Sequence, residues 1–148
     1  MFQGSHNIVL DSKGRIAIPA KIRECLMELC GGQIVMTSHL RDRCIVIYPM
    51  TEWQDLSAQL QKLSAVNRHV ERAQRMMIGG CDPITLDGNG RVLIAQPLRN
   101  YAKLDKNLLL VGLGKKMELW DQEIWTRTVV EADLGDEPVP PEMLSLML

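Results

Sequence analysis

The sequence predicts an α+β protein built from two tandem, pseudo-symmetric β-β-α-β-β-α units that are joined by a helical connector. The first observation is that the motif D-x-x-x-R occurs twice, from Asp11 to Arg15 and from Asp87 to Arg91. The second is that the residues around both motifs align when the chain is shifted by 76 positions, and the third is that a later aromatic pair repeats at a shift of 72. Chance does not keep the motif, its flanks and their order together, so the chain contains an internal repeat.

The repeat sets the expected domain organisation. We expect a first unit over residues 1–55, a helical connector over 56–80, a second unit over 81–132 and an acidic, flexible C-terminal tail over 133–148. Units of about 50 to 60 residues bury a small share of their surface, so we expect the two to pack together. The identical pairs at the shift of 76 include Ile8 with Ile84, Leu10 with Leu86, Gly14 with Gly90, Ile18 with Ile94, and Arg23 with Arg99.

The elements of the first unit follow from local residue chemistry. Residues 11–14 have turn chemistry, and Gly14 is free to adopt a positive φ, so the turn joins two short strands into a hairpin. Pro19 suits the first turn of a helix, which Gly31 and Gly32 end. One apolar helix face is predicted, with Ile22, Cys25, Leu26 and Leu29 at helical spacing. The predicted strands are 7–10, 15–18, 33–37 and 44–48, and a second helix begins at about residue 49.

The connector and the second unit are assigned in the same way. Leucines at 56, 60 and 63 and a second apolar stripe from 66 to 77 predict helices, with a break near residues 64–67. The second unit repeats the hairpin, the helix opened by Pro97 and the two later strands. Its predicted strands are 84–86, 91–95, 108–111 and 117–120, and its last helix spans 121–132.

Charge and cysteine content exclude several classes of protein. The net charge is −1, but basic residues gather between Lys13 and Arg23 while the end of the chain is acidic. No apolar run is long enough to span a membrane and the N-terminus lacks a signal-peptide pattern, so we expect no membrane partner and a cytoplasmic location. The four cysteines and three histidines form no metal-ligand or catalytic pattern, and no phosphate-binding glycine motif is present. We therefore expect no metal, no cofactor, no small-molecule substrate and no catalytic residue.

The segment from Gly14 to Glu24, G-R-I-A-I-P-A-K-I-R-E, resembles the signature of AbrB-type swapped-hairpin transcription factors. The tandem form, with D-S-K-G-R in the first copy and D-G-N-G-R in the second, resembles the MraZ family of bacterial regulators. The resemblance implies that the two units form one AbrB-like, swapped-hairpin domain of the β-barrel type, and that the protein assembles into a ring-shaped homo-oligomer. It also implies binding to repeated short sites on double-stranded DNA in the promoter of the protein's own operon, which holds division and cell-wall genes, and hence association with the nucleoid.

The resemblance places DNA contact on the arginine of each motif, Arg15 and Arg91. An arginine can donate two hydrogen bonds to guanine in the major groove, which is wide enough for a two-stranded ribbon. Lys13 at the tip of the turn would donate to phosphate or a base, and we expect Asp11 to hold the Arg15 guanidinium across the hairpin. The second copy offers Asp87 and Asn89 at the corresponding positions. Because Asn89 replaces a lysine, the second turn has less positive charge.

Three other interpretations also fit the sequence. The Asp11 and Arg15 side chains could form only a structural ion pair, a role compatible with DNA contact. The protein could be an oligomeric interaction scaffold with no specific DNA target. It could also be an enzyme using a cysteine thiolate, although none of Cys25, Cys30, Cys44 and Cys81 has an evident base beside it.

Overall fold

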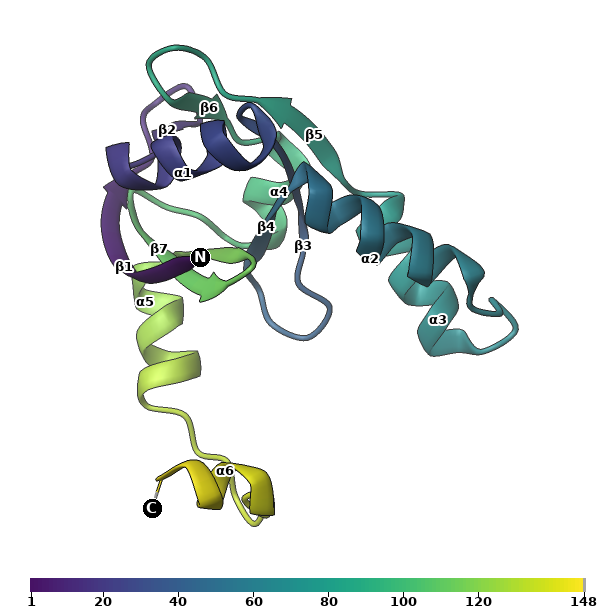
Figure 1. The fold of residues 1–148 in the computed structure, drawn as a ribbon. Helices are drawn as coiled ribbons and strands as arrows, with labels where there is room; N and C mark the ends of the chain where they lie inside the picture. Colours follow the sequence, from purple (N-terminus) through teal and green to yellow (C-terminus); the bar gives the residue numbers. More distant parts are fainter. Residues whose placement is uncertain (148) are drawn as a thin grey trace.

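The computed structural model describes residues 1–147, and its centre is a six-stranded antiparallel sheet with the strand order β1-β7-β8-β4-β3-β5 (Figure 1). A separate two-stranded ribbon pairs β2 with β6. The strands are β1 Phe2–Val9, β2 Arg15–Ala17, β3 Gln33–Ser38, β4 Ile45–Pro49, β5 Asp82–Thr85, β6 Arg91–Leu93, β7 Asn107–Gly114 and β8 Met117–Asp121.

The helices lie around this sheet and extend from it in two directions. In Figure 1, α2 and α3 project from the body as an arm, while α5 and α6 extend from the end opposite to the ribbon. The helices are α1 Ala20–Cys30, α2 Met50–Lys62, α3 Arg68–Ala73, α4 Gln96–Tyr101, α5 Gln122–Trp125 and α6 Pro141–Met147. Two π-helical turns, η1 Gln74–Ile78 and η2 Thr126–Val130, continue α3 and α5.

The strands of the two units are exchanged, which corrects the expected hairpins. Neither 7–10 with 15–18 nor 84–86 with 91–95 forms a ladder. Instead β1 pairs with β7, β5 pairs with β3, and the ribbon joins the two units at Ile16 and Val92. A short strand with one apolar face accepts any antiparallel partner of matching pattern, so the local sequence does not specify the exchange. The exchange makes the two units one structure.

The α+β class is confirmed, but the sheet is open. Within residues 1–147 its edge strands β1 and β5 do not pair with each other, so the expected barrel-type closure is absent. The break predicted in the connector lies between α2 and α3, at residues 63–67. The proposed domain boundaries themselves stay a prediction.

One apolar core serves both units. Ile16 and Leu26 of the first unit and Val92 and Leu108 of the second belong to the same buried cluster. Complete burial of such a side chain stabilises the fold by roughly 1.5–3 kcal/mol. The predicted face of α1 is correct for Ile22 and Leu26 but wrong for Leu29, which is 52% exposed. The helix ends at Gly31 in the left-handed conformation, as predicted.

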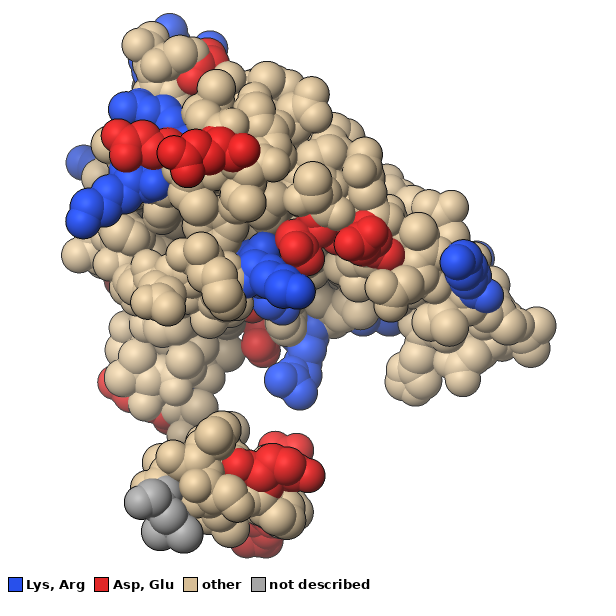
Figure 2. Space-filling view, viewed as in Figure 1, with Lys and Arg blue, Asp and Glu red and all other residues tan. Residues whose placement is uncertain are grey.

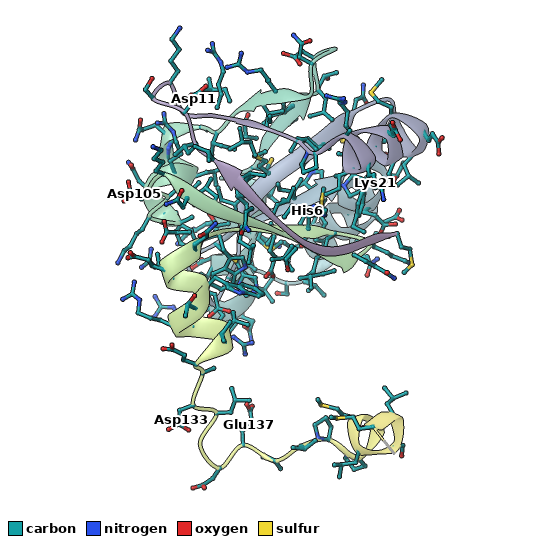
Figure 3. The ribbon with its side chains drawn as sticks, turned by 90° about the vertical axis from the view of Figure 1, so that its left-hand side faces the viewer. His6, Asp11, Lys21, Asp105, Asp133 and Glu137 are labelled. Carbon is teal, nitrogen blue, oxygen red and sulfur yellow. The ribbon has the colours of Figure 1, made fainter. Side chains whose placement is uncertain are left out.

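The C-terminal segment lies apart from the core. The residues from Thr126 to Met147 are all exposed, and α6 forms within the predicted acidic tail. Figure 3 shows Asp133 and Glu137 at the opposite end of the molecule from Asp11. None of the helices described over residues 1–147 is long and apolar enough to cross a bilayer.

Candidate nucleic-acid interface

Two matching turns lie at the end of the molecule that carries the ribbon (Figure 1). In the first, the Asp11 Oδ1 atom accepts hydrogen bonds from the backbone N–H groups of Lys13, at 2.8 Å, and of Arg15, at 2.9 Å. The Gly14 N–H closes the turn on the Asp11 carbonyl at 3.0 Å, and Gly14 adopts the predicted positive φ of 83°. The motif D-x-x-x-R therefore encodes a turn held by its own aspartate.

The second turn has the same construction. The Asp87 Oδ1 atom accepts from the N–H groups of Asn89, at 2.8 Å, and of Arg91, at 3.0 Å, and Gly90 has a φ of 70°. In both turns these hydrogen bonds favour the charged carboxylate. The N–H of Arg15 is the main cause that lowers the pKa of Asp11, and the N–H of Arg91 is the main cause that lowers the pKa of Asp87.

The turns also hold each other. The N–H of Ile18 donates to the Gly90 carbonyl and the N–H of Ile94 donates to the Gly14 carbonyl, both at 2.8 Å. The Asp11 Oδ2 atom pairs with the Arg91 Nη2 atom at 3.1 Å. The expected bond between Asp11 and the Arg15 guanidinium is therefore wrong. Asp11 fixes Arg15 through its backbone and uses its other oxygen for the arginine of the second unit.

Two further arginines, Arg23 and Arg99, position the turns, although neither was among the site residues predicted from the sequence. The Arg23 Nη1 atom donates to the Asn89 carbonyl at 2.8 Å. The Arg99 Nε atom donates to the Ile94 carbonyl at 2.9 Å, and its guanidinium covers Gly14. The signal that could have identified them is their identity at equivalent positions of the repeat.

The geometry of the exposed groups suits an anionic partner. Lys13, Arg91 and Asn89 are exposed and Arg15 is half-buried, so four of the six predicted site residues present hydrogen-bond donors at this end of the molecule. Asp87 is used inside its own turn, whereas Asp11 holds its turn and also pairs with Arg91 of the other unit. Figure 2 shows lysine and arginine side chains gathered at the corner formed by the ribbon and α1, with acidic side chains among them, whereas the distal tail carries acidic side chains only.

Metal-binding clusters and the cysteine thiols are the two candidate sources of catalytic chemistry that the sequence raised. Over residues 1–147 no group of three or more His, Cys, Asp or Glu side chains could hold a metal ion. All four cysteines are free thiols, and burial raises the pKa of the Cys44 thiol far above its usual range. A thiol with a raised pKa is protonated near neutral pH and is a poor nucleophile.

The exchanged strands, the shared core and the paired turns define an α+β fold of two similar units that exchange strands within one chain. The family model described as "MraZ protein, putative antitoxin-like" matches the chain twice, over residues 1–76 and 77–138. The chain therefore belongs to the MraZ family.

Similar proteins cover the whole chain and share its length. The protein named transcriptional regulator MraZ from Saccharophagus degradans is 52% identical over 148 residues, which is 100% of each chain. The protein of the same name from Marinobacter nauticus is 47% identical and covers 99% of this chain and 98% of its own. The one from Methylococcus capsulatus is 44% identical over 99% of each. The family is thus one of transcriptional regulators and not of enzymes.

Proposed function

We propose that the protein is a sequence-specific DNA-binding transcriptional regulator that contacts duplex DNA through its two D-x-x-x-R turns. The observation that carries the proposal is the placement of both turns side by side, with their arginines on the outer face of the β2–β6 ribbon. A two-stranded ribbon fits the major groove of B-form DNA. The names of the related proteins support the regulatory role.

Each side chain has a distinct task in this proposal. Arg15 donates a pair of hydrogen bonds to the O6 and N7 atoms of guanine, and Arg91, whose Nη2 atom pairs with Asp11, donates to guanine through its remaining N–H groups. Lys13 is an exposed point charge suited to phosphate, whereas Asn89 at the equivalent position offers an amide. Asp11 and Asp87 act through the turns that they hold. The first turn binds DNA more strongly because it has the additional cation.

The small number of cations per chain favours assembly of several copies. Affinity for DNA grows with the number of phosphates neutralised, and a single chain neutralises few. A ring-shaped homo-oligomer facing several short repeats gains affinity through effective concentration. We propose that such a ring binds the promoter repeats of the protein's own operon, which holds division and cell-wall genes, in the nucleoid of the cytoplasm.

Mobility-shift titrations with the upstream region of the protein's own gene test the proposal. Arg15→Ala should weaken specific binding by roughly 5- to 150-fold, because one bidentate guanine contact contributes about 1–3 kcal/mol. Arg15→Lys keeps the charge but loses the planar fork, so it should weaken specific binding while preserving non-specific binding. Arg68→Ala is the matched control, since Arg68 is exposed at the start of α3 in the projecting arm.

The outcomes separate a regulator from a scaffold. Loss of specificity in the Arg15 variants, with Arg68→Ala unchanged, supports the proposal. Equal, salt-insensitive binding by all four proteins contradicts it. A large assembly with no preference for any duplex would identify the protein as an interaction scaffold.

A further inference from the structure

The outer face of the β2–β6 ribbon carries apolar side chains beside its arginines. Side chains alternate along a strand, so Ile16 and Val92 point inward and are only 2% and 3% exposed. The neighbouring positions point outward. They are Arg15 and Ala17 on β2 and Arg91 and Leu93 on β6.

The register places one arginine opposite one apolar residue in each outer row. Arg15 pairs with Leu93, and Ala17 pairs with Arg91. Leu93 is 52% exposed, and Ala17 is exposed as well. A single exposed leucine is common on protein surfaces. This leucine, however, lies within the small patch from which both motif arginines project.

We propose that Leu93, together with the smaller Ala17, contacts the methyl groups of thymines in the major groove. This inference rests on the proposed function. Thymine is the one base that presents a methyl group in that groove, and apolar side chains recognise it by packing against it. The apolar contact of Leu93 and Ala17 adds a second kind of base recognition to the hydrogen bonds that the arginines donate.

The spacing of the ribbon agrees with this arrangement. Opposed side chains of an antiparallel pair have Cβ atoms about 4.5–5.5 Å apart. Successive bases along a strand are separated by about 3.4 Å. When Arg15 binds a guanine, Leu93 therefore faces a base within one or two steps of it. The preferred thymine lies close to the guanine that the opposed arginine binds.

The two units are unequal in this respect. Positions 17 and 93 are equivalent in the repeat, but one holds alanine and the other leucine. Leucine covers a methyl group more completely, so the second unit supplies most of the thymine recognition. The turn that lacks a lysine thus gains specificity by another means.

The test uses the upstream fragment of the protein's own gene, amplified either with thymidine or with deoxyuridine triphosphate, which removes only the methyl groups. The wild-type protein should bind the uracil fragment about fourfold more weakly for each thymine methyl group that Leu93 or Ala17 would otherwise cover. Leu93→Ser should bind the thymine fragment more weakly and should lose the preference for thymine. Leu113→Ser is the matched control, because Leu113 is 46% exposed near the end of β7 distant from the turns.

Each outcome has one meaning. A thymine preference that Leu93→Ser abolishes and Leu113→Ser retains supports the inference. Equal binding of both fragments by a wild-type protein that still selects its own upstream region overturns the inference and leaves the proposed function intact. A preference that survives Leu93→Ser, or a change in assembly mass as its only effect, also overturns it. Failure to select any duplex overturns the proposed function and the inference together.

Discussion

Substitution of Gly14 in the first turn should lower the stability of the protein far more than substitution of Gly88 in the second turn. Gly14 has a φ of 83°, and a Cβ atom added there would lie 2.6 Å from the Arg99 Cζ atom. The left-handed conformation costs a residue with a Cβ roughly 1–2 kcal/mol. Displacing Arg99 from the Ile94 carbonyl costs about 1–2 kcal/mol more. Gly14→Ala should therefore lower the free energy of unfolding by about 2–4 kcal/mol.

Gly88→Ala is the matched control. A Cβ atom at Gly88 meets nothing within 4 Å, and its φ is not in the left-handed region. Substitution there restricts the unfolded chain, so stability should stay equal or rise by up to about 1 kcal/mol. Urea unfolding followed by circular dichroism, at equal protein concentration because association shifts stability, measures both variants.

The two parts of the cost can be separated by a double-mutant cycle. In an Arg99→Ala background the guanidinium is absent, so Gly14→Ala should cost only the backbone part of about 1–2 kcal/mol. A Gly14→Ala protein within about 0.5 kcal/mol of the Gly88→Ala protein would refute both the strained turn and the packing of Arg99 on it.

Three further predictions concern charge and burial. The pKa values of Asp11 and Asp87 are lowered, so their contribution to stability is complete above the ordinary carboxyl pKa of about 4 and disappears as the pH falls through the lower values of the folded state. Between about pH 5 and pH 2, urea unfolding should therefore show a smaller loss of unfolding free energy for Asp11→Asn than for the wild type. Equal losses of unfolding free energy would contradict the turn geometry. Truncation after Val130 removes five carboxylates that lie at the end of the molecule opposite to the turns, and exposed charges separated by more than the Debye length of about 10 Å at 0.1 M salt are largely screened. Titrations should therefore show DNA binding within about twofold of the full chain, and a large gain in affinity would contradict the separation of the tail from the DNA-binding end. Glu118→Ala leaves the buried indole N–H of Trp120 without its acceptor at 2.9 Å, so the unfolding free energy should fall by about 1–3 kcal/mol, whereas Glu118→Gln keeps an acceptor and should lose much less.

The local features of the turns could be predicted from the sequence because they depend on neighbouring residues. The positive φ of Gly14 and the end of α1 at Gly31 follow from the conformational freedom of glycine. The internal repeat also indicated that the two units are equivalent, which the swapped pairing of the strands bears out.

The interactions between residues of the two different units could not be predicted from neighbouring residues. Asp11 lies four residues from Arg15 and 80 from Arg91, and only the exchange of strands brings the distant arginine to its carboxylate. The exposure of Leu29 has a similar origin, since helical spacing cannot say how wide a face the rest of the fold covers. Such interactions depend on the order in which the strands pair, and that order is determined by the packing of the whole core.

The exchange of strands has a consequence for the order of events during synthesis. Strand β1 begins at Phe2, and its partner β7 ends at Gly114, so more than one hundred residues must be made before this ladder can close. At roughly 5–20 residues per second the first strand waits about 5–20 seconds on the ribosome without its partner. Strand β3 likewise lacks β5 until the connector has emerged. The nascent first half is therefore an incomplete sheet with exposed edges, and the chain reaches a protected native state only once almost its full length is available.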